Sequence, residues 1–460
     1  MANSKKLTPS NLAAHVQQGL AALGTSGRRV TLALSGGVDS VVLLQLLSKL
    51  SRPLGFTLSA IHINHQISPN ASDWADFCTH LCAQKKIPIQ VKKVRIARRS
   101  EHGLEAAARA ARYRAFAELE SDFLLLAHHL DDQVETLMLN LLRGSGLLGA
   151  SGMPEMRLQA LLGENQHITL FRPLFAVPRS LVLAYAQQHD LRWIEDESNT
   201  DTAFTRNFLR HEVLPVIEQR FPAYRETLAR AAQHFAAADS LLDELAQIDL
   251  AKAMRVQKLH LRTLMELSSA RAMNVLRAYL KLHGVPALDN ERLLEWMRQL
   301  LGARGDRQID LGVAGLRLQR YRGEAWVEQD RPGLDPAWTQ TWNGEQQIQL
   351  CELDLALSFQ STQGSGISLA KLTQNDVTIR LRQGGEKLQP SCTRPRRSLK
   401  HLLQEAAIPP WRRKYLPLIF SGEQLVAVAS IGVDCAFQAE PGEPGLLPHW
   451  VNKAKLSDLS

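Results

Sequence analysis

The chain has 460 residues, of which 45% are hydrophobic and 22% are charged, values typical of a globular protein with two or three domains. No apolar run approaches the length of a membrane span, and none follows Lys5 and Lys6, so we expect neither a transmembrane segment nor a signal peptide. The five cysteines are odd in number and scattered, which favours reduced thiols in a cytoplasmic protein over a disulfide framework. They are Cys78, Cys82, Cys351, Cys392 and Cys435.

The net charge of +8 is concentrated near the carboxy terminus. Residues 380–414, here called the basic segment, contain ten lysines and arginines but only two acidic residues, Glu386 and Glu405. This segment alone therefore accounts for the whole excess of positive charge. Such a cluster is typical of a protein that binds a polyanion such as nucleic acid, and a solvated surface is the alternative.

The first recognisable structure in the chain is a strand, a glycine turn and a helix. Residues 30–34 form an aliphatic and β-branched run that is too short for a helix, and residues 41–47 read as an apolar helix. The Ser-Gly-Gly turn at residues 35–37 aims backbone N–H groups at one point, and the helix dipole adds positive potential there. Glycine also lets a phosphate approach the backbone closely. We therefore predict an anion site, with hydroxyl donors from Ser35 and Ser40.

This turn is neither a Walker A motif nor a Gly-x-Gly-x-x-Gly motif. Residues 35–40, Ser-Gly-Gly-Val-Asp-Ser, instead resemble the PP-loop of ATP pyrophosphatases, which cleave ATP between its α- and β-phosphates. A glycine-containing turn capped by Asp39 explains these six residues equally well. The later motifs decide between the two interpretations.

The following segments alternate between strands and helices, which predicts parallel βαβ units and an α/β fold with a doubly wound parallel sheet. Strands are expected at residues 56–63, 87–91 and 123–128, and helices at residues 11–23, 74–86, 103–119 and 132–142. Ligands of such sheets bind beyond the carboxyl ends of the strands. The predicted anion site lies at these ends, together with His62, His65, His128 and His129.

Two carboxylates follow the last of these strands, Asp132 and Glu135, in the spacing of a helix capping box. Together with the imidazoles of His128 and His129 they also suit Mg²⁺–ATP chemistry, because Mg²⁺ bridges phosphates with one or two carboxylates. Both interpretations can hold at once, since a cap keeps carboxylates in place. We expect Asp39 and Asp132 to be the Mg²⁺ ligands.

With these motifs in place, the chain resembles the tRNA(Ile)-lysidine synthetases of the PP-loop ATP pyrophosphatase superfamily. The matching blocks keep the order of that family and cover most of residues 30–215. They are residues 35–40, His62 with His65, and residues 103–113, 128–136, 143–146, 152–153, 172–174, 195–199 and 205–210. Ala150 departs from the family, which more often has leucine there. Residues 380–386, 399–400 and 408–411 resemble the family's carboxy-terminal domain.

The resemblance implies a ligase that uses ATP to join L-lysine to C2 of the wobble cytidine in a tRNA(Ile) with a CAU anticodon, which changes codon reading from AUG to AUA. The cytidine O2 attacks the α-phosphate of ATP and pyrophosphate leaves; the lysine amine then attacks C2 and AMP leaves. ATP and Mg²⁺ are the expected cofactors, and tRNA(Ile) and L-lysine are the expected partners. No membrane is involved, and a homodimer is kept as a candidate assembly.

The motifs and the resemblance together assign roles to individual residues. The catalytic candidates are Asp39, His129, Asp132, Glu135, Arg109 and Arg112. ATP is expected to contact Ser35, Gly36, Gly37, Val38, Asp39, Ser40 and His62. The tRNA is expected to contact Arg143, Arg206, Arg380, Arg382, Arg396, Arg397 and Lys400. The group that accepts the proton of the lysine amine is left open among Glu135, Asp132 and Asp39.

Four regions are expected along the chain. Residues 1–220 form the PP-loop catalytic domain, and residues 221–335 form a mainly helical domain that contacts substrate, with a hairpin at residues 316–328. Residues 336–375 are expected to be an irregular linker. Residues 376–460 are expected to form a small, basic α+β domain that binds tRNA.

Three alternative functions are distinguished by features of the sequence. A PP-loop tRNA thiolase commonly carries Cys-x-x-Cys pairs, and a glutamine-dependent amidotransferase normally carries a glutaminase domain; we find neither feature here. A non-catalytic RNA-binding protein could have the basic segment alone. It would not need Asp39, Asp132 and Glu135 beside an anion loop.

Overall fold

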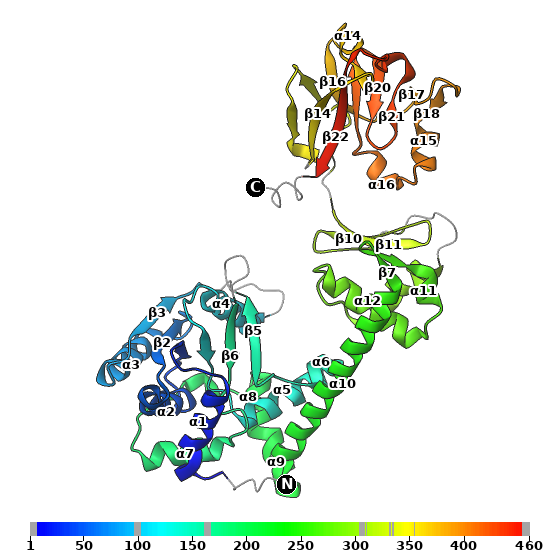
Figure 1. Cartoon of the computed structure of the whole chain (residues 1–460). Helices are drawn as coiled ribbons and strands as arrows, with labels where there is room; N and C mark the ends of the chain where they lie inside the picture. The colour runs from blue at the N-terminus through cyan, green and yellow to red at the C-terminus, as the bar shows by residue number, and fades with distance from the viewer. Residues whose placement is uncertain are drawn as a thin grey trace. The chain divides into compact units, whose positions relative to one another are not determined.

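The computed structural model describes residues 7–95, 103–160, 167–302, 309, 311–330, 333, 335–353 and 355–452. They belong to two compact units, Met1–Leu245 and Ala246–Ser460, which are taken in turn (Figure 1). Within these described ranges, no helix is both long enough and apolar enough to span a membrane.

A six-stranded sheet with the order β3-β2-β1-β4-β6-β5 forms the centre of the first unit. All of its strands run parallel except β5, which is antiparallel at one edge. They are β1 (Arg29–Ala33), β2 (Thr57–Asn64), β3 (Ile89–Lys93), β4 (Phe123–Leu125), β5 (Met156–Ala160) and β6 (His167–Phe171). The predicted doubly wound α/β fold is confirmed, and the strand order reverses between β1 and β4.

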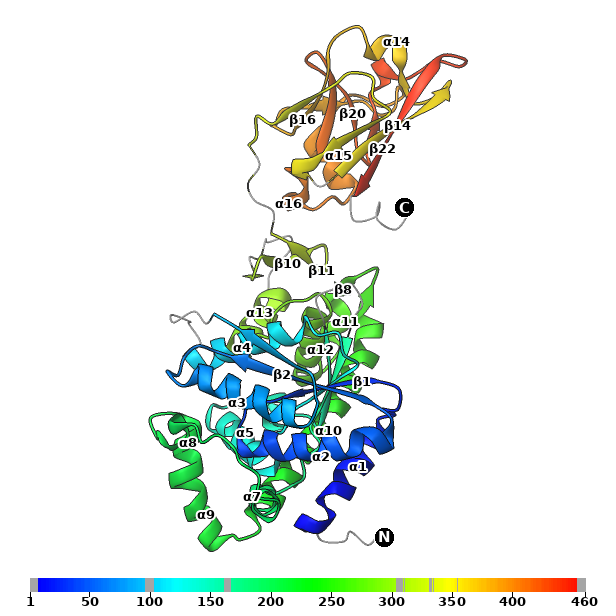
Figure 2. The same ribbon diagram turned by 90° about the vertical axis from the view of Figure 1, so that its left-hand side faces the viewer.

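Helices pack on this sheet through two separate cores, as expected for a parallel sheet whose strands are buried on both faces. One core joins Val30 and Leu32 of β1 to α1, α2 and α7. The other joins Leu124 of β4 and Leu170 of β6 to Phe116 of α4. Figures 1 and 2 show α1 and α2, in blue, next to each other. The helices are α1 (Leu12–Ala22), α2 (Val38–Leu54), α3 (Ala71–Gln84), α4 (Gly103–Phe116), α5 (Leu130–Leu142), α6 (Leu147–Ala150) and α7 (Arg179–Gln188).

Several short helical segments follow α7 and lead to a long helix. They are η2 (Glu197–Thr200), α8 (Thr205–Phe208), the π-helical turn η3 (Leu209–Val213), α9 (Leu214–Arg220) and α10 (Tyr224–Ala253). Val134 of α5 packs against Leu214 and Tyr224, and Leu137 of α5 packs against Ala232. This packing brings α8 and η3, which carry two arginines, next to the acidic start of α5.

The second unit begins with helices and an antiparallel sheet of the order β7-β8-β11-β10-β9. Its helices are α11 (Leu261–Met265), α12 (Ser269–Leu282) and α13 (Asn290–Gly302). Its strands are β7 (Met254–Arg255), β8 (Lys258–His260), β9 (Leu311–Val313), β10 (Leu316–Tyr321) and β11 (Glu324–Gln329). Tyr279 of α12 and Trp296 of α13 lie in one core with Ala325 of β11. The helical region and the hairpin expected from the sequence are both confirmed.

Two further antiparallel sheets share one core at the carboxy-terminal end, with the orders β12-β16-β19-β20-β21 and β13-β14-β22-β15. Their strands are β12 (Thr339–Trp342), β13 (Gln347–Leu350), β14 (Leu355–Gln363), β15 (Ile367–Ser368), β16 (Val377–Leu381), β19 (Pro417–Ser421), β20 (Gln424–Val428), β21 (Gly432–Val433) and β22 (Pro444–Asn452). A small ribbon of β17 (Lys387–Leu388) and β18 (Arg397–Ser398) precedes the helices α15 (Leu399–Glu405) and α16 (Pro410–Arg413). The expected α+β domain is therefore present.

The prediction of an irregular linker at residues 336–375 is wrong. Strands β12, β13 and β14 lie in that range, and they pair with distant strands: Gln340 is opposite Ile379, and Leu357 is opposite Trp450. Because these partners are far away in the chain, the local pattern does not reveal the pairing.

The expectation that all cysteines are reduced is wrong for one pair. Cys392 and Cys435 form a disulfide, with their Cα atoms 5.3 Å apart. They are 43 positions apart in the sequence, and only the fold of the carboxy-terminal domain brings them together. Cys78, Cys82 and Cys351 are free thiols.

Candidate active site

The predicted anion site is the turn between β1 and α2. Helix α2 begins directly after Gly37, and no side chain caps it, so the N–H groups of its first turn are available to a ligand. The hydroxyl of Ser40 stiffens the turn, because it donates to Gly37 O at 2.9 Å and accepts from the Gly36 N–H at 3.2 Å. Uncapped N–H groups at the positive end of a 17-residue helix suit a phosphate.

Glycine is required at position 36 for two reasons. Its φ is +94°, and an added Cβ would lie 2.5 Å from Ile194 Cδ1 and 3.2 Å from Cys78 Sγ. Ile194 also donates its backbone N–H to Gly36 O at 2.9 Å. The segment around Ile194 therefore supports the turn, a contact that the spacing of the motif does not predict.

Gly36→Ala is expected to weaken ATP binding about tenfold or more and to destabilise the fold by about 1–3 kcal/mol, because backbone strain and a steric clash coincide. Isothermal titration calorimetry and thermal denaturation measure the two effects. Gly24→Ala is the matched control, because Gly24 has a φ of +67° but no atom within 4 Å of the added Cβ. Wild-type ATP affinity in the Gly36 variant would contradict the assignment.

Two histidines of β2 and its carboxyl end lie beside the turn. His62 is buried, and its Nδ1 lies 2.9 Å from Leu34 O, so this residue supports the start of the loop. His65 Nδ1 is buried and has no hydrogen-bond partner in the described part of the chain. Burial, with the charges of Arg112 and His62, lowers the pKa of His65 to about 4. Burial lowers the pKa of His62 as well, so both imidazoles favour the neutral form.

The capping box that the sequence suggests at Asp132 and Glu135 is wrong, because α5 starts earlier, at Leu130. His129 is the N-cap: its Nδ1 accepts from the Asp132 N–H at 3.3 Å, and Asp132 Oδ2 accepts from the His129 N–H at 3.0 Å. These exchanged hydrogen bonds hold the His129 imidazole and the Asp132 carboxylate side by side. His129 Nδ1 is an acceptor in this arrangement, so a neutral ring carries its proton on Nε2.

Three predicted site residues meet at this point. His129 Nε2 lies 3.4 Å from Asp132 Oδ2 and 3.7 Å from Asp39 Oδ2. Burial, with the like charge of Asp132, raises the pKa of Asp39. Burial also acts to raise the pKa of Asp132, but the nearby imidazoles and the Arg206 guanidinium outweigh it and hold this pKa at about 2. Two carboxylates with different proton affinities therefore lie beside the predicted phosphate site.

The donor set fits Mg²⁺. Asp39 Oδ1 is buried and lacks a hydrogen-bond partner among the described residues, so a cation would satisfy it. Within the same residues there is no cluster of three or more His, Cys, Asp and Glu side chains that could hold a metal. Mg²⁺ does not need one, because it binds one or two carboxylates and completes its shell with phosphate oxygens and water.

Glu135 lies in a clamp of two arginines. The carboxylate is 1% exposed; its Oε1 accepts from Arg210 Nε at 2.6 Å, and its Oε2 accepts from Arg206 Nε and Arg210 Nη2, both at 2.9 Å. Arg206, which the sequence analysis assigns to tRNA, also donates to Thr136 Oγ1 at 2.9 Å. Arg210 Nη2 lies 3.7 Å from Asp132 Oδ1, so the clamp connects to the carboxylates of the site.

Arg210 is a site residue that the sequence analysis does not single out. It lies on the π-helical turn η3, and such turns occur frequently at functional sites. In the sequence, the feature that pointed to Arg210 was its four-residue spacing from Arg206, which places two cations on one side of a helix. The sequence does not show that this side contacts Glu135.

The other arginines predicted in the first unit lie outside the Glu135 clamp. Arg112 contributes to the electrostatic environment of His65 and His128, so it belongs to the surroundings of the site. Arg109 is exposed, and its guanidinium lies 5.1 Å from the centre of the Tyr113 ring. Arg143 is exposed at the carboxyl end of α5.

Three family models match the chain: a PP-loop domain over residues 9–217, a TilS substrate binding domain over residues 259–326 and a TilS substrate C-terminal domain over residues 377–450. The tRNA(Ile)-lysidine synthase of Nitrosomonas europaea is 45% identical to this chain, and the match covers 98% of each. The chain belongs to the tRNA(Ile)-lysidine synthase family. Relatives of the same name from Azoarcus sp. and Aromatoleum aromaticum are each 39% identical, over 94% and 92% of this chain and 93% and 97% of their own.

Two of the three free cysteines of this tRNA(Ile)-lysidine synthase family member do not favour the thiolase alternative. Cys78 and Cys82 are both buried. Burial raises the pKa of Cys78 to about 12 and that of Cys82 to about 11. Sulfur transfer needs thiolates, and these two thiols stay protonated at neutral pH.

Half of the ten cations in the basic segment are paired with carboxylates. Five of its arginines form ion pairs: Arg380 with Glu423, Arg382 with Glu386, Arg396 with Asp434, Arg397 with Glu405 and Arg412 with Glu328. Three of these carboxylates lie outside the segment, so the charge counted from sequence overstates the local excess. Arg396 in particular contacts an Asp434 carboxylate that is 1% exposed, which makes this arginine part of the folded domain.

Four cations of the segment are exposed, with no carboxylate of the described chain within ion-pair distance: Lys387, Arg394, Lys400 and Lys414. Lys414 differs from the other three in that its Nζ lies 4.7 Å from the centre of the Tyr415 ring. The other three lie close together in the chain. Lys387 is in β17, Lys400 is in α15, and Arg394 lies between these elements. We call these three residues the unpaired cations.

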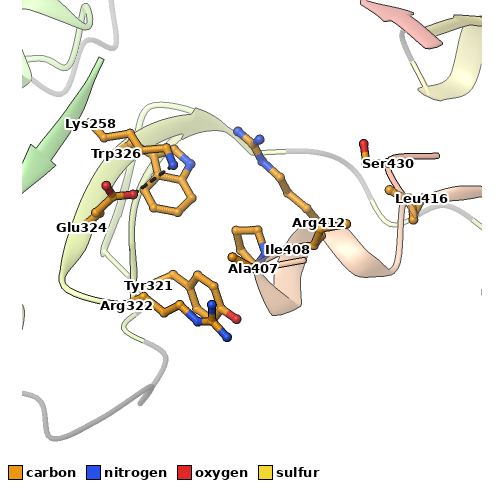
Figure 3. A pocket seen from close by; sticks show the side chains of 11 residues that line it. Lys258, Tyr321, Arg322, Glu324, Trp326, Ala407, Ile408, Arg412, Leu416 and Ser430 are labelled. Atoms are coloured by element: carbon orange, nitrogen blue, oxygen red, sulfur yellow. Dashed lines mark hydrogen bonds and ion pairs between the residues drawn. The ribbon is translucent and has the colours of Figure 1, made fainter. Parts of the chain in front are cut away.

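The second unit also contains a cavity of about 300 Å³ between the β10–β11 hairpin and residues 407–416 (Figure 3). Lys258 Nζ and Arg412 Cζ lie 4.7 Å and 5.8 Å from the centre of the Trp326 rings. Figure 3 shows Trp326 and Tyr321 projecting from the hairpin and Arg412 projecting from the other wall. The cavity therefore combines aromatic surfaces with cations.

Proposed function

We propose that this protein forms lysidine: it joins lysine to C2 of the wobble cytidine of tRNA(Ile), with ATP as the activating substrate. The observation that carries the proposal is a PP-loop beside Asp39 and Asp132 in a chain that matches tRNA(Ile)-lysidine synthases over nearly its full length. A non-catalytic RNA-binding protein would not need this arrangement of anion loop and carboxylates.

The proposed reaction has two steps. The cytidine O2 attacks the α-phosphate of ATP and pyrophosphate leaves; the neutral amine of lysine then attacks C2, and AMP leaves. The first step is needed because C2 is a poor electrophile until its oxygen becomes part of a leaving group. The N–H groups at the start of α2 would stabilise the negative charge on the phosphates. The cytidine must also leave its loop stack to reach this site, as in other enzymes that modify bases.

The cofactor and residue roles are part of the same proposal. Asp39 and Asp132 would hold Mg²⁺, which when bound neutralises charge on the phosphates and on the pyrophosphate leaving group. Arg206 and Arg210 would add positive charge beside these carboxylates, held in place by Glu135. Both oxygens of Glu135 are occupied by arginines, so we assign the proton of the lysine amine to another acceptor, either a site carboxylate or a substrate phosphate.

The tRNA contacts are proposed at two places in the second unit. The unpaired cations would bind backbone phosphates, because their charge is not neutralised within the protein. The cavity at Trp326 would accept an unpaired nucleotide, since aromatic rings flanked by cations are a common platform for single-stranded RNA. A cytoplasmic location follows from the tRNA substrate. Assembly as a homodimer stays a prediction.

Neutralising the unpaired cations, as Lys387→Gln, Arg394→Gln and Lys400→Gln together, is expected to lower the slope of log K against log salt by about 2–3 units. Cognate and unrelated tRNAs should lose affinity by similar factors, because phosphates carry no sequence information. Filter binding at several salt concentrations measures both effects. ATP affinity should not change.

Arg397→Gln is the matched control, because Arg397 is already paired with Glu405 at 2.7 Å. This variant should change the slope by much less than one unit. An equal change per residue in both variants would show that the paired arginines contact tRNA as the sequence analysis predicts. Unchanged tRNA affinity and salt dependence in the triple variant would show that the segment is a solvated surface.

The proposed activity is tested by incubating the purified chain with ATP, tRNA(Ile) carrying a CAU anticodon and radiolabelled lysine. We expect label in the tRNA, together with AMP and pyrophosphate in equal amounts. Omitting lysine should leave pyrophosphate release intact. Two results would contradict the proposal. One is transfer of label from a sulfur donor to the tRNA, and the other is tight binding of the tRNA without any cleavage of ATP.

A further inference from the structure

Arg172 is a buried cation whose hydrogen-bond partners are neutral. It follows β6 directly and is 2% exposed. Its Nε donates to His128 Nδ1 at 3.2 Å, and its Nη1 donates to Pro154 O. Tyr113 contributes to its electrostatic environment. No carboxylate in the described part of the chain lies within ion-pair distance of it. A buried charge without a counterion is costly, so fold stability alone does not explain this residue.

The contact with Arg172 determines which nitrogen of His128 carries a proton. A guanidinium has only donors, so His128 Nδ1 must accept, and the proton of the neutral ring is on Nε2. A protonated ring would place a second positive charge against Arg172. Burial, with the charges of Arg172, Arg206 and Arg112, lowers the pKa of His128 to about 3 despite the opposing effect of Asp132. The ring is therefore neutral throughout the physiological range.

The sheet places this pair at the predicted ligand crevice. Strands β4 and β6 are neighbours, with Leu125 opposite Phe171, so the residues that follow the two strands lie at one edge. His128 Nε2 has no hydrogen-bond partner in the described chain. The imidazole can therefore donate from Nε2 to a ligand that enters beside Asp132.

We propose that Arg172 is a positioning residue that holds His128 as the Nε2–H tautomer, so that His128 donates a hydrogen bond to an anionic oxygen of the substrate and does not accept the lysine proton. This inference rests on the proposed function, because the oxygen meant here belongs to the α-phosphate. A preorganised neutral donor stabilises charge on phosphate oxygens without reorganising during the reaction.

The tautomer can be measured directly in the full chain by ¹⁵N NMR of labelled histidine, with His128→Gln used to assign the signal. We expect a proton-bearing Nε2 and an unprotonated Nδ1 at neutral pH. A proton on Nδ1 would overturn the proposal whatever the activity. A chain that shows the expected tautomer but forms no lysidine would instead contradict the proposed function alone.

Variants test the coupling between the two residues. Arg172→Met is expected to give a mixture of tautomers and to slow adenylation about 10- to 100-fold, as for other residues that orient a functional histidine. The amide of His128→Gln can donate from the position of Nε2 without a tautomer to hold, so Arg172→Met should cost less than about threefold in that background. The same cost in both backgrounds would assign Arg172 a merely structural role and overturn the proposal.

Arg157→Met is the control, because Arg157 is exposed and lies 5.9 Å from the same Tyr113 ring without touching His128. It should alter neither the tautomer nor the rate. If Arg172→Met does not fold, Arg172→Gln keeps a polar side chain there, but its amide can either donate or accept and therefore no longer fixes the tautomer. An unchanged tautomer in that variant, with a wild-type rate, contradicts the proposal.

Discussion

Asp39→Asn is expected to lower tRNA-dependent pyrophosphate release by about a hundredfold or more. Asparagine keeps the shape of the side chain but removes the charge that lies between the phosphate turn, His129 and Asp132. Binding of tRNA should be unaffected, because the unpaired cations belong to the second unit. A pyrophosphate assay and filter binding measure the two quantities. Release at the wild-type rate would refute a role for Asp39 in binding Mg²⁺–ATP.

The same variant should not unfold. Burial raises the pKa of Asp39, so its charged form is less favourable in the folded chain than in the unfolded one. Stability is therefore lost as pH rises from the unfolded pKa through the folded one, and above the folded pKa the wild type carries this cost in full. Without divalent cations, Asp39→Asn should have an equal or higher melting temperature. Asp76→Asn is the control, because Asp76 is an exposed residue of α3, and it should change neither stability nor activity.

Glu135→Gln is expected to destabilise the first unit by about 3 kcal/mol, or about 6–12 °C in melting temperature. The substitution leaves Arg206 and Arg210, whose side chains are 29% and 22% exposed, without their shared counterion. Thermal and chemical denaturation measure the loss. Glu218→Gln is the matched control, because Glu218 pairs with Arg225 but is 46% exposed, and its loss should cost less than about 1 kcal/mol.

Kinetics of the same variant separate two roles for Glu135. If the carboxylate holds the arginine clamp, both adenylation and lysine transfer should fall, because the clamp also contacts Asp132. If it accepts the lysine proton, pyrophosphate release should stay normal and only the transfer of lysine should fail. A stable variant that adenylates at the wild-type rate but transfers no lysine would contradict the clamp.

Much of the first unit was predictable from the sequence, because its strands, turns and helices are specified by residues that are adjacent in the chain. The β1 strand, the glycine turn and α2 are adjacent in the chain, and a five-residue aliphatic strand before Ser-Gly-Gly has few other ways to fold. The alternation of strands and helices predicts a parallel sheet, and a parallel sheet brings the carboxyl ends of its strands to one edge. Asp39, His129 and Asp132 were predicted together on this basis, and they do meet.

What the tertiary structure decided was the partner of each polar side chain. Glu135 and Arg210 are 75 positions apart, and only the packing of η3 against α5 makes a proposed general base into the centre of an arginine clamp. The carboxylates of Asp434, Glu423 and Glu328 reach the basic segment only in the folded second unit, so the number of cations that remain unpaired cannot be counted from the sequence. Strand β14 likewise depends on β22, with Leu357 opposite Trp450. Composition and periodicity specify which residues are buried and where helices form, but an ion pair or a strand register depends on residues far apart in the chain, which only the folded chain brings together.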